Sequence, residues 1–342
     1  MDSEAQSTDA ARLRSLITGY EASQVIYVAA RLGVADLLGE EPRTAEELAE
    51  ALHVDAGALQ RVLHALAALG LLAHLGESRY ALTGSGGRLR AGVPGSLRAV
   101  ALLSGERSYR AWGGLLHSVR TGETAFPHVF GMGTFEYMAA HPEVAGFYNE
   151  AMAAGAAERA AAVVAAYDFS GGGTVVDVGG GHGTLLIAIL SANPAARGVL
   201  FERESAAVGA RARIEEAGLG SRCAVVTGDF FHSVPGDGRV YLLSHIVHNW
   251  DDQRCGTILA NCRAAMSPRA KLLVLEQVLP ERFEPSREAV RASMADLHML
   301  AITGGQERTA GEYRRLFAAA GFSLTSVIGT AVAESLVEGI PV

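Results

Sequence analysis

The residues with the clearest chemical potential follow short apolar segments in the second half of the chain. Asp177 ends one such segment and leads into a glycine-rich run from Gly179 to Gly183, where a ligand can approach the backbone closely. Glu202 ends the next segment, at about the spacing of an acid that binds ribose hydroxyls. Asp229 and Phe230 follow the third segment and offer a carboxylate for an amino group and a ring for a flat ring face. Together they predict a site for an adenosine-containing cofactor.

A dinucleotide site is the obvious rival for such a loop. Its fingerprint needs a third glycine, yet Thr184 stands at that position, and no lysine follows as in a phosphate-binding P-loop. The loop therefore favours an adenosine cofactor without a pyrophosphate. A second alternative is that Glu202 or Asp229 is an ordinary helix-capping acid.

The elements that must position these residues alternate between apolar strands and helices. Strands are expected at residues 174–178, 198–202, 223–227, 239–244 and 271–276. Short apolar strands separated by helices predict an α/β fold with a parallel, doubly wound sheet, whose ligands sit beyond the carboxyl ends of the strands. Two further runs, at 322–328 and 334–338, predict an antiparallel hairpin at the edge of that sheet.

The first part of the chain is mainly helical. Thr44 and Glu47 form a capping box, Asp55 can cap the next helix, and apolar runs around Gly76 predict a hairpin, so that the order resembles a winged helix. Residues 16–38 are apolar on nearly every face, which predicts burial in a core or against a partner.

A DNA-binding regulator is an alternative for this region, but its second helix offers few polar side chains to a groove. Those are Gln60, Arg61 and His64, and the chain carries a formal net charge of -8. We therefore expect a protein–protein role and no nucleic-acid partner.

Whole-chain composition excludes several classes of protein. The three cysteines form no CxxC pair, so we expect neither a disulfide framework nor a zinc site, and no metal. The N-terminus lacks the pattern of a signal peptide, and no apolar run reaches membrane-spanning length. These features predict a cytoplasmic protein of 342 residues without a membrane partner.

Several motifs, in order along nearly the whole chain, resemble S-adenosylmethionine-dependent O-methyltransferases of plant phenylpropanoid and bacterial polyketide metabolism. They are Leu82-Thr83-Gly84-Ser85-Gly86, Phe147-Tyr148-Asn149-Glu150-Ala151-Met152, the loop at Asp177, Gly228-Asp229-Phe230-Phe231, His248-Asn249-Trp250-Asp251-Asp252, Gly304-Gly305-Gln306-Glu307-Arg308-Thr309 and Ser335-Leu336-Val337-Glu338-Gly339. The resemblance implies a winged-helix dimerisation domain at 1–95, a helical linker at 96–167 and a Rossmann-like methyltransferase domain at 168–342. It also implies a homodimer formed through the N-terminal domain.

The resemblance assigns roles to the residues that match. The cofactor-binding set is Asp177, Gly179, Gly181, Glu202, Asp229, Phe230 and Ser244, and the cofactor is S-adenosylmethionine, which leaves as S-adenosylhomocysteine. His248 matches the general base, and Glu276 and Glu307 match the acids that position it. The acceptor is a small aromatic molecule. Candidates for its pocket wall are Trp112, Phe130, Phe147, Met152, Asp296 and Met299, although simple core packing would explain most of the aromatic residues.

Acid–base chemistry supports His248 independently. A phenol has a pKa near ~10 and histidine near ~6.5, so a neutral imidazole can take the hydroxyl proton as the oxygen loses its negative character. A carboxylate on the other ring nitrogen would fix the tautomer. Plant members usually have aspartate where this chain has Asn249, which changes how the substrate hydroxyl is held. The alternative within the family is a member diverted to hydroxylation or decarboxylation; retention of His248 favours O-methylation.

Overall fold

The computed structural model describes residues 2–342, apart from the side chains of residues 2–8, 205 and 206. The chain divides into two compact units, one formed by Met1–Gly113 with Phe135–Ala154 and the other by Gly114–Thr134 with Gly155–Val342. The division into 1–95, 96–167 and 168–342 expected from the sequence stays a prediction.

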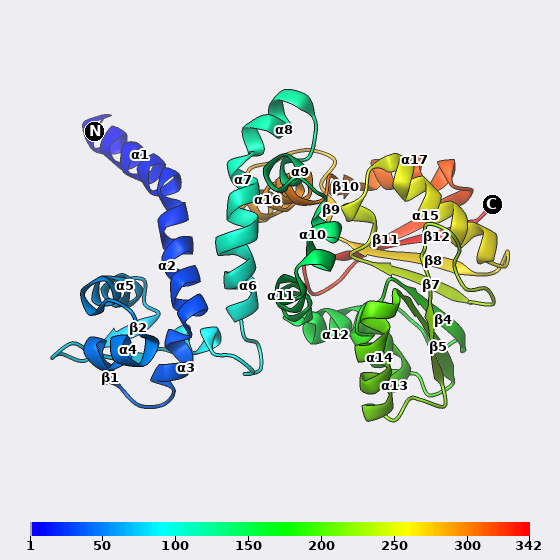
Figure 1. The fold of residues 1–342 in the computed structure, drawn as a ribbon. Coiled ribbons are helices and arrows are strands. Elements are labelled where there is room, and N and C mark those ends of the chain that lie inside the picture. The colour runs from blue at the N-terminus through cyan, green and yellow to red at the C-terminus, as the bar shows by residue number, and fades with distance from the viewer. Residues whose placement is uncertain (1) are drawn as a thin grey trace. The chain divides into compact units, whose positions relative to one another are not determined.

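The first unit begins with helices and a small sheet (Figure 1). Its first elements are α1 (Asp2–Ile17), α2 (Gly19–Leu32), α3 (Val34–Leu38), α4 (Ala45–Leu52) and α5 (Ala56–Ala68), with β1 (Arg43–Thr44), β2 (Leu72–His74) and β3 (Arg79–Leu82). The capping box of Thr44 with Glu47 and the Asp55 cap are both present, and β2 and β3 form the expected antiparallel hairpin. The predicted order of helix, helix and hairpin is confirmed.

The apolar stretch at 16–38 does not form one helix buried in this unit. Gly33 adopts a left-handed conformation between α2 and α3, and Leu16, Ile17 and Tyr20 are exposed. The expected burial in a core holds for the later part of the stretch, such as Val34 and Leu38, and burial of its first residues against a partner stays a prediction.

The rest of the first unit consists of short helical segments. They are η1 (Gly86–Leu89), α6 (Arg98–Leu103), the π-helical turn η2 (Ser104–Ser108), α7 (Tyr109–Gly113), α10 (Thr134–Ala140) and α11 (Pro142–Ala153). Helix α11 packs against α6 through Ala151 and Phe147, which contact Ala99 and Leu103.

The second unit is built on a seven-stranded sheet with the order β11-β12-β8-β7-β4-β5-β6. Its strands are β4 (Gly173–Val178), β5 (Ala196–Glu202), β6 (Cys223–Thr227), β7 (Val240–Ser244), β8 (Lys271–Glu276), β11 (Phe322–Gly329) and β12 (Ser335–Pro341). The first five are parallel, and β12 runs antiparallel to β8 and to the edge strand β11. The predicted parallel sheet and its C-terminal hairpin are confirmed.

Alternation along the strands explains why helices cover both faces of this sheet (Figure 1). Tyr241 and Leu243 of β7 pack in a core with α15 (Asp252–Ala265) and α17 (Ala310–Ala319). Val240 and Leu242 point the other way, toward a core with α12 (Ala156–Ala166), α13 (Thr184–Ala192) and α14 (Glu204–Glu216). With both faces covered, the carboxyl ends of the parallel strands are where a ligand can bind.

The remaining elements of this unit are helices, a turn and two short strands. They are α8 (Leu115–Thr121), α9 (Ala125–Phe130), the 3₁₀ turn η3 (Val247–Asn249), α16 (Arg287–Ile302), and the short strands β9 (Val278–Leu279) and β10 (Arg308–Thr309), which pair in parallel. Helix α16 packs against α8 and α9.

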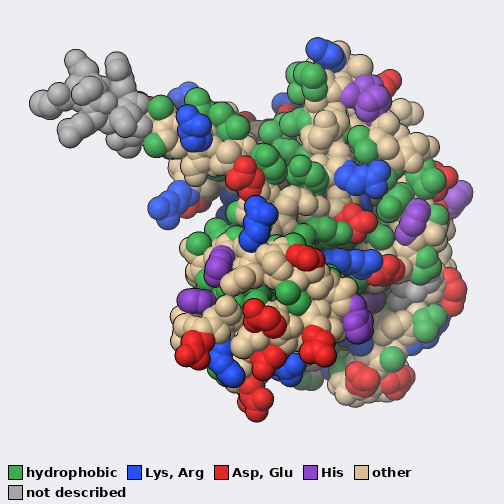
Figure 2. All heavy atoms as spheres, turned by 60° about the vertical axis from the view of Figure 1, so that its left-hand side comes forward, with side chains coloured by type: hydrophobic (Ala, Val, Ile, Leu, Met, Phe, Trp, Pro, Cys, Tyr) green, Lys and Arg blue, Asp and Glu red, His purple; other side chains and the backbone are tan. Residues whose placement is uncertain are grey.

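Two properties of the surface and the helices bear on partners. On the face shown in Figure 2, acidic and basic side chains are interspersed. The lysine and arginine side chains visible there form no continuous basic surface. No helix in the described part of the chain is long and apolar enough to cross a membrane.

Candidate active site

The turn η3, directly after β7, presents His248 at the carboxyl edge of the sheet. Glu276, the last residue of the neighbouring strand β8, holds this turn through hydrogen bonds to its backbone. Its Oε1 accepts hydrogen bonds from the backbone N–H groups of Val247 at 2.9 Å and His248 at 3.3 Å. The end of one strand therefore positions the residue that follows the next.

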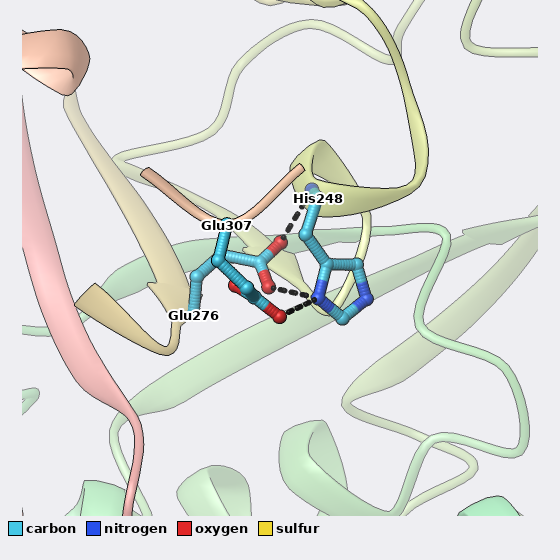
Figure 3. A group of neighbouring side chains, drawn as sticks. All are labelled: His248, Glu276 and Glu307. Carbon is cyan, nitrogen blue, oxygen red and sulfur yellow. Dashed lines mark hydrogen bonds and ion pairs between the residues drawn. The ribbon is translucent and has the colours of Figure 1, made fainter. Parts of the chain in front are cut away.

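Two carboxylates converge on one nitrogen of the His248 ring (Figure 3). The Nδ1 atom lies 3.0 Å from Oε1 of Glu307 and 3.1 Å from Oε2 of Glu276. The side chain of His248 is 13% exposed, whereas those of Glu276 and Glu307 are 0% and 4% exposed. The structure thus brings together the three residues predicted to carry catalysis, and Nε2 points away from both acids (Figure 3).

Burial and charge act in opposite directions on the His248 imidazole. Burial alone would lower its pKa, but the carboxylates of Glu276 and Glu307 outweigh burial, and the pKa is raised above the ordinary value. Burial also raises the pKa of Glu276, and the interaction with His248 lowers that pKa by a smaller amount. The arrangement strengthens the imidazole as a base and stabilises the imidazolium that forms when it takes a proton.

The glycine-rich loop after β4 has the backbone expected of a ligand cradle. Gly179, Gly181 and Gly183 all have positive φ, a region that other residues rarely adopt. A Cβ at Gly179 would collide with Ile246 and lie 3.4 Å from Phe230, so the loop and the predicted ring contact are neighbours. Glu202 holds the loop in place, because its carboxylate accepts the N–H of Gly181 at 2.9 Å.

Asp177 supports the loop from inside the sheet. Its side chain is buried, and neither carboxylate oxygen has a hydrogen-bond partner among the described residues. Burial, together with the charge of Glu202, raises the pKa of Asp177 to about 7. A Cβ at Gly180 would collide with this carboxylate, so Asp177 contacts the loop backbone. Its predicted role in cofactor binding stays a prediction.

The other predicted cofactor residues lie at neighbouring strand ends. Asp229 follows β6 and is half-buried, and its Oδ1 accepts the N–H of Phe231 at 2.8 Å. Ser244 ends β7, and its Oγ lies 3.3 Å from Nδ1 of His245. His245 has positive φ, and its Nε2 lies 3.1 Å from Glu334.

These groups fit the cofactor expected from the sequence. The loop offers backbone without side chains, Glu202 offers a carboxylate suited to a diol, and Phe230 offers a ring face. The second oxygen of Glu202 accepts only the N–H of its neighbour Arg203, at 2.7 Å, among the described residues.

The predicted wall residues are divided between the two units. Trp112, in α7, and Phe147 and Met152, in α11, belong to the first unit. Phe130 ends α9 in the second unit, where its ring stacks on Phe126 with centroids 4.3 Å apart. Asp296 and Met299 lie on α16 and are half-buried. Their contact with an acceptor stays a prediction.

Two hydrogen bonds and one buried charge near the site were not expected from the sequence. Asp296 accepts the N–H of Glu307 at 2.9 Å and so supports one of the acids. Asn249 is buried and donates from Nδ2 to the carbonyl of His245 at 2.8 Å. Arg308 is buried and only 1% exposed. The sequence does not indicate this, because an arginine next to a glutamate is typical of a charged surface.

His248, Glu276 and Glu307 also meet the geometric condition for a small metal site. One ligand atom from each lies within 4.8 Å of the others. Activity in the presence of EDTA tests the expectation of a reaction without a metal.

Comparison with known proteins matches both parts of the chain. Residues 112–323 match the O-methyltransferase domain family, and residues 14–89 match the O-methyltransferase dimerisation domain. The phenazine O-methyltransferase PhzM of Lysobacter antibioticus is 48% identical over 330 residues, which cover 96% of each chain. The phenazine-1-carboxylate N-methyltransferase of Pseudomonas aeruginosa is 33% identical over 319 residues, which cover 93% of each chain.

A solved structure similar to this chain contains both S-adenosylmethionine and an aromatic acid. The O-methyltransferase NcsB1 from neocarzinostatin biosynthesis, in complex with S-adenosylmethionine and 2-hydroxy-5-methyl naphthoic acid, has a TM-score of 0.82 and 32% identity. The match covers 94% of this chain and 96% of that one.

Proposed function

The chain belongs to the O-methyltransferase family and uses S-adenosylmethionine, and from that premise we propose that it methylates a hydroxyl group of a small aromatic natural product, with His248 as the general base. The observation that carries this proposal is the arrangement of His248 with Glu276 and Glu307. Both carboxylates contact Nδ1 of His248. Its other ring nitrogen, Nε2, has no hydrogen-bond partner among the described residues.

The charges around the imidazole favour removal of a phenolic proton. A phenol and a histidine differ by roughly 3.5 pKa units, and each unit corresponds to about 1.4 kcal/mol. Glu276 and Glu307 raise the pKa of His248 and so narrow this gap. Bound S-adenosylmethionine supplies an electrophilic methyl group on its sulfonium sulfur. His248 accepts the proton at Nε2 as the acceptor oxygen forms its new bond, and the two carboxylates stabilise the imidazolium.

The cofactor site uses the groups at the strand ends. We assign the backbone of Gly179 and Gly181 to the methionine part, Glu202 to the ribose hydroxyls, and Asp229 with Phe230 to the adenine. Ser244 contributes one further polar contact. Glu202 does two things in this assignment, because the same carboxylate that binds the ribose also fixes the loop through Gly181.

Methylation of nitrogen is the second candidate, because some relatives are N-methyltransferases. An aromatic ring nitrogen attacks with a free lone pair and has no proton to lose. A hydroxyl has one. A buried imidazole held by two carboxylates serves an acceptor that must lose a proton, and this favours a hydroxyl over an aromatic ring nitrogen. An amino group also loses a proton, so an acceptor that carries both groups is needed to distinguish them.

Product analysis with a labelled cofactor tests the proposal. The enzyme is incubated with S-adenosyl-[methyl-¹³C]methionine and EDTA, together with hydroxylated phenazines, hydroxynaphthoates and 3-amino-4-hydroxybenzoate, which carries both an oxygen and a nitrogen acceptor. We expect one added methyl group, whose ¹³C chemical shift is that of a methoxy carbon. Label on nitrogen, a product that has gained oxygen or lost CO₂ without label, or a requirement for metal would contradict the proposal.

A further inference from the structure

The segment that carries Glu307 lies directly against the turn that carries His248. A Cβ at Gly305 would collide with the carbonyl oxygen of His248 and with the backbone of Asn249. The segment can approach the backbone of the turn this closely only because position 305 has no side chain. Its next residues, Glu307 and Arg308, therefore meet the same turn from one side.

Arg308 binds the backbone on both sides of His248. Its guanidinium donates to the carbonyl of Val247 at 3.3 Å and to the carbonyl of Trp250 at 3.0 Å. It also donates to Oδ1 of Asp252 from Nε at 3.0 Å and from Nη2 at 2.7 Å. Asp252 is the first residue of α15, so one side chain ties the turn to the helix that follows it.

Only a planar guanidinium can make this set of contacts. Arginine presents five N–H donors in a rigid fork, whereas lysine is a compact point charge with three rotatable donors. Arg308 is 1% exposed, so it is packed in one place by its surroundings. The side chain of Asp252 is 70% exposed, which makes it the accessible end of the network.

We infer that Arg308 is a positioning residue for the proposed base: Glu307 holds the ring of His248 while Arg308, the next residue, holds the backbone turn from which that ring projects. The inference rests on the proposed function. It implies that the distance from Nε2 to the acceptor hydroxyl depends on Arg308, although Arg308 does not touch the acceptor. A displacement of the base by a fraction of an ångström would lower kcat more than it would alter ligand binding.

The charge of Arg308 has a second effect on the same imidazole. Its positive charge lowers the pKa of His248, against the two carboxylates. The charged or titratable groups packed around this centre come from several elements: Glu276, Glu307, Arg308, His245, Asp296 and Tyr313. Removal of the Arg308 charge should therefore raise the pKa of His248 further, and lysine at this position should not.

The test compares Arg308→Lys, Arg308→Met and Asp252→Asn with Arg315→Met, an exposed arginine on α17, as the matched control. Kinetic constants over pH are measured alongside the Kd of S-adenosylhomocysteine by calorimetry. Both Arg308 variants should lose about tenfold or more in kcat with the Kd changed less than about twofold, and Asp252→Asn should lose about two- to fivefold. In Arg308→Met alone, the acid limb of kcat should move to higher pH. The control should match the wild type.

Two results would overturn the inference. One is an unchanged kcat in both Arg308→Lys and Asp252→Asn. The other is a parallel loss of kcat and of S-adenosylhomocysteine affinity with no shift in the pH profile, which would mean that Arg308 only supports the fold. If Arg308→Met does not fold, Arg308→Lys and Asp252→Asn decide the matter. A wild-type enzyme that forms no O-methyl product would instead contradict the proposed function.

Discussion

At the scale of single residues, the pKa of His248 depends on its burial and on the charged side chains around it. Burial opposes its protonation, Glu276 and Glu307 favour it, and Arg308 opposes it. The imidazole must be neutral to accept a proton. Because the carboxylates raise its pKa, activity should be lost as the pH falls through that raised value.

Replacement of either acid should therefore widen the active pH range on the acid side. In Glu276→Gln and Glu307→Gln, one negative charge is gone, the pKa of His248 falls, and the acid limb of kcat should move down by about one pH unit. The check is a pH profile of kcat beside that of Glu204→Gln, an exposed glutamate on α14. A limb that stays in place or moves to higher pH would show that these carboxylates do not set the charge of the base.

The sequence allowed much of this site to be predicted, because its residues stand at the ends of recognisable strands or in recognisable motifs. His248 and Glu307 stand in motifs and Glu276 ends an expected strand, and the structure places them within hydrogen-bond distance. Arg308 and Asp296 could not be assigned their contacts beforehand. Both act through partners about 11 to 61 residues away in the chain, and no local pattern marks such a partner.

At the scale of elements, the prediction was most successful where hydrophobic periodicity decides the structure. The strand expected at 271–276 is β8, and the strand expected at 174–178 is β4 with one further residue. Short elements were not foreseen. Strands β9 and β10 have two residues each and pair only because the tertiary fold brings Arg308 beside Val278. The turn η3 is likewise held from outside, by Glu276 and Arg308.

At the scale of the whole molecule, we propose that two copies associate through the N-terminal region. Residues 14–89 match an O-methyltransferase dimerisation domain, and apolar side chains of α1 and α2 are exposed in the single chain. Leu16 is 70% exposed and Ile17 is 65% exposed. Full burial of each such side chain against a second copy would stabilise the dimer by roughly 1.5–3 kcal/mol.

Light scattering coupled to size-exclusion chromatography tests the dimer. The wild type should have twice the mass of the 35.7 kDa chain, and Leu16→Glu with Ile17→Glu should shift it toward one chain. Val208→Glu is the matched control, because Val208 is 65% exposed on α14 and is not among residues 14–89, which match the dimerisation domain. A monomeric wild type, or a double variant that stays fully dimeric, would refute this interface.

The most direct test of the whole proposal is a comparison of wild type with His248→Gln in the labelled methyl-transfer assay. Glutamine keeps a polar side chain of similar reach but cannot act as a base at neutral pH. If His248 takes the proton of the acceptor, kcat should fall by about 100-fold or more, while the Kd of S-adenosylhomocysteine changes less than about twofold. A variant that forms the O-methyl product at a rate close to that of the wild type would contradict the assignment of His248 as the base.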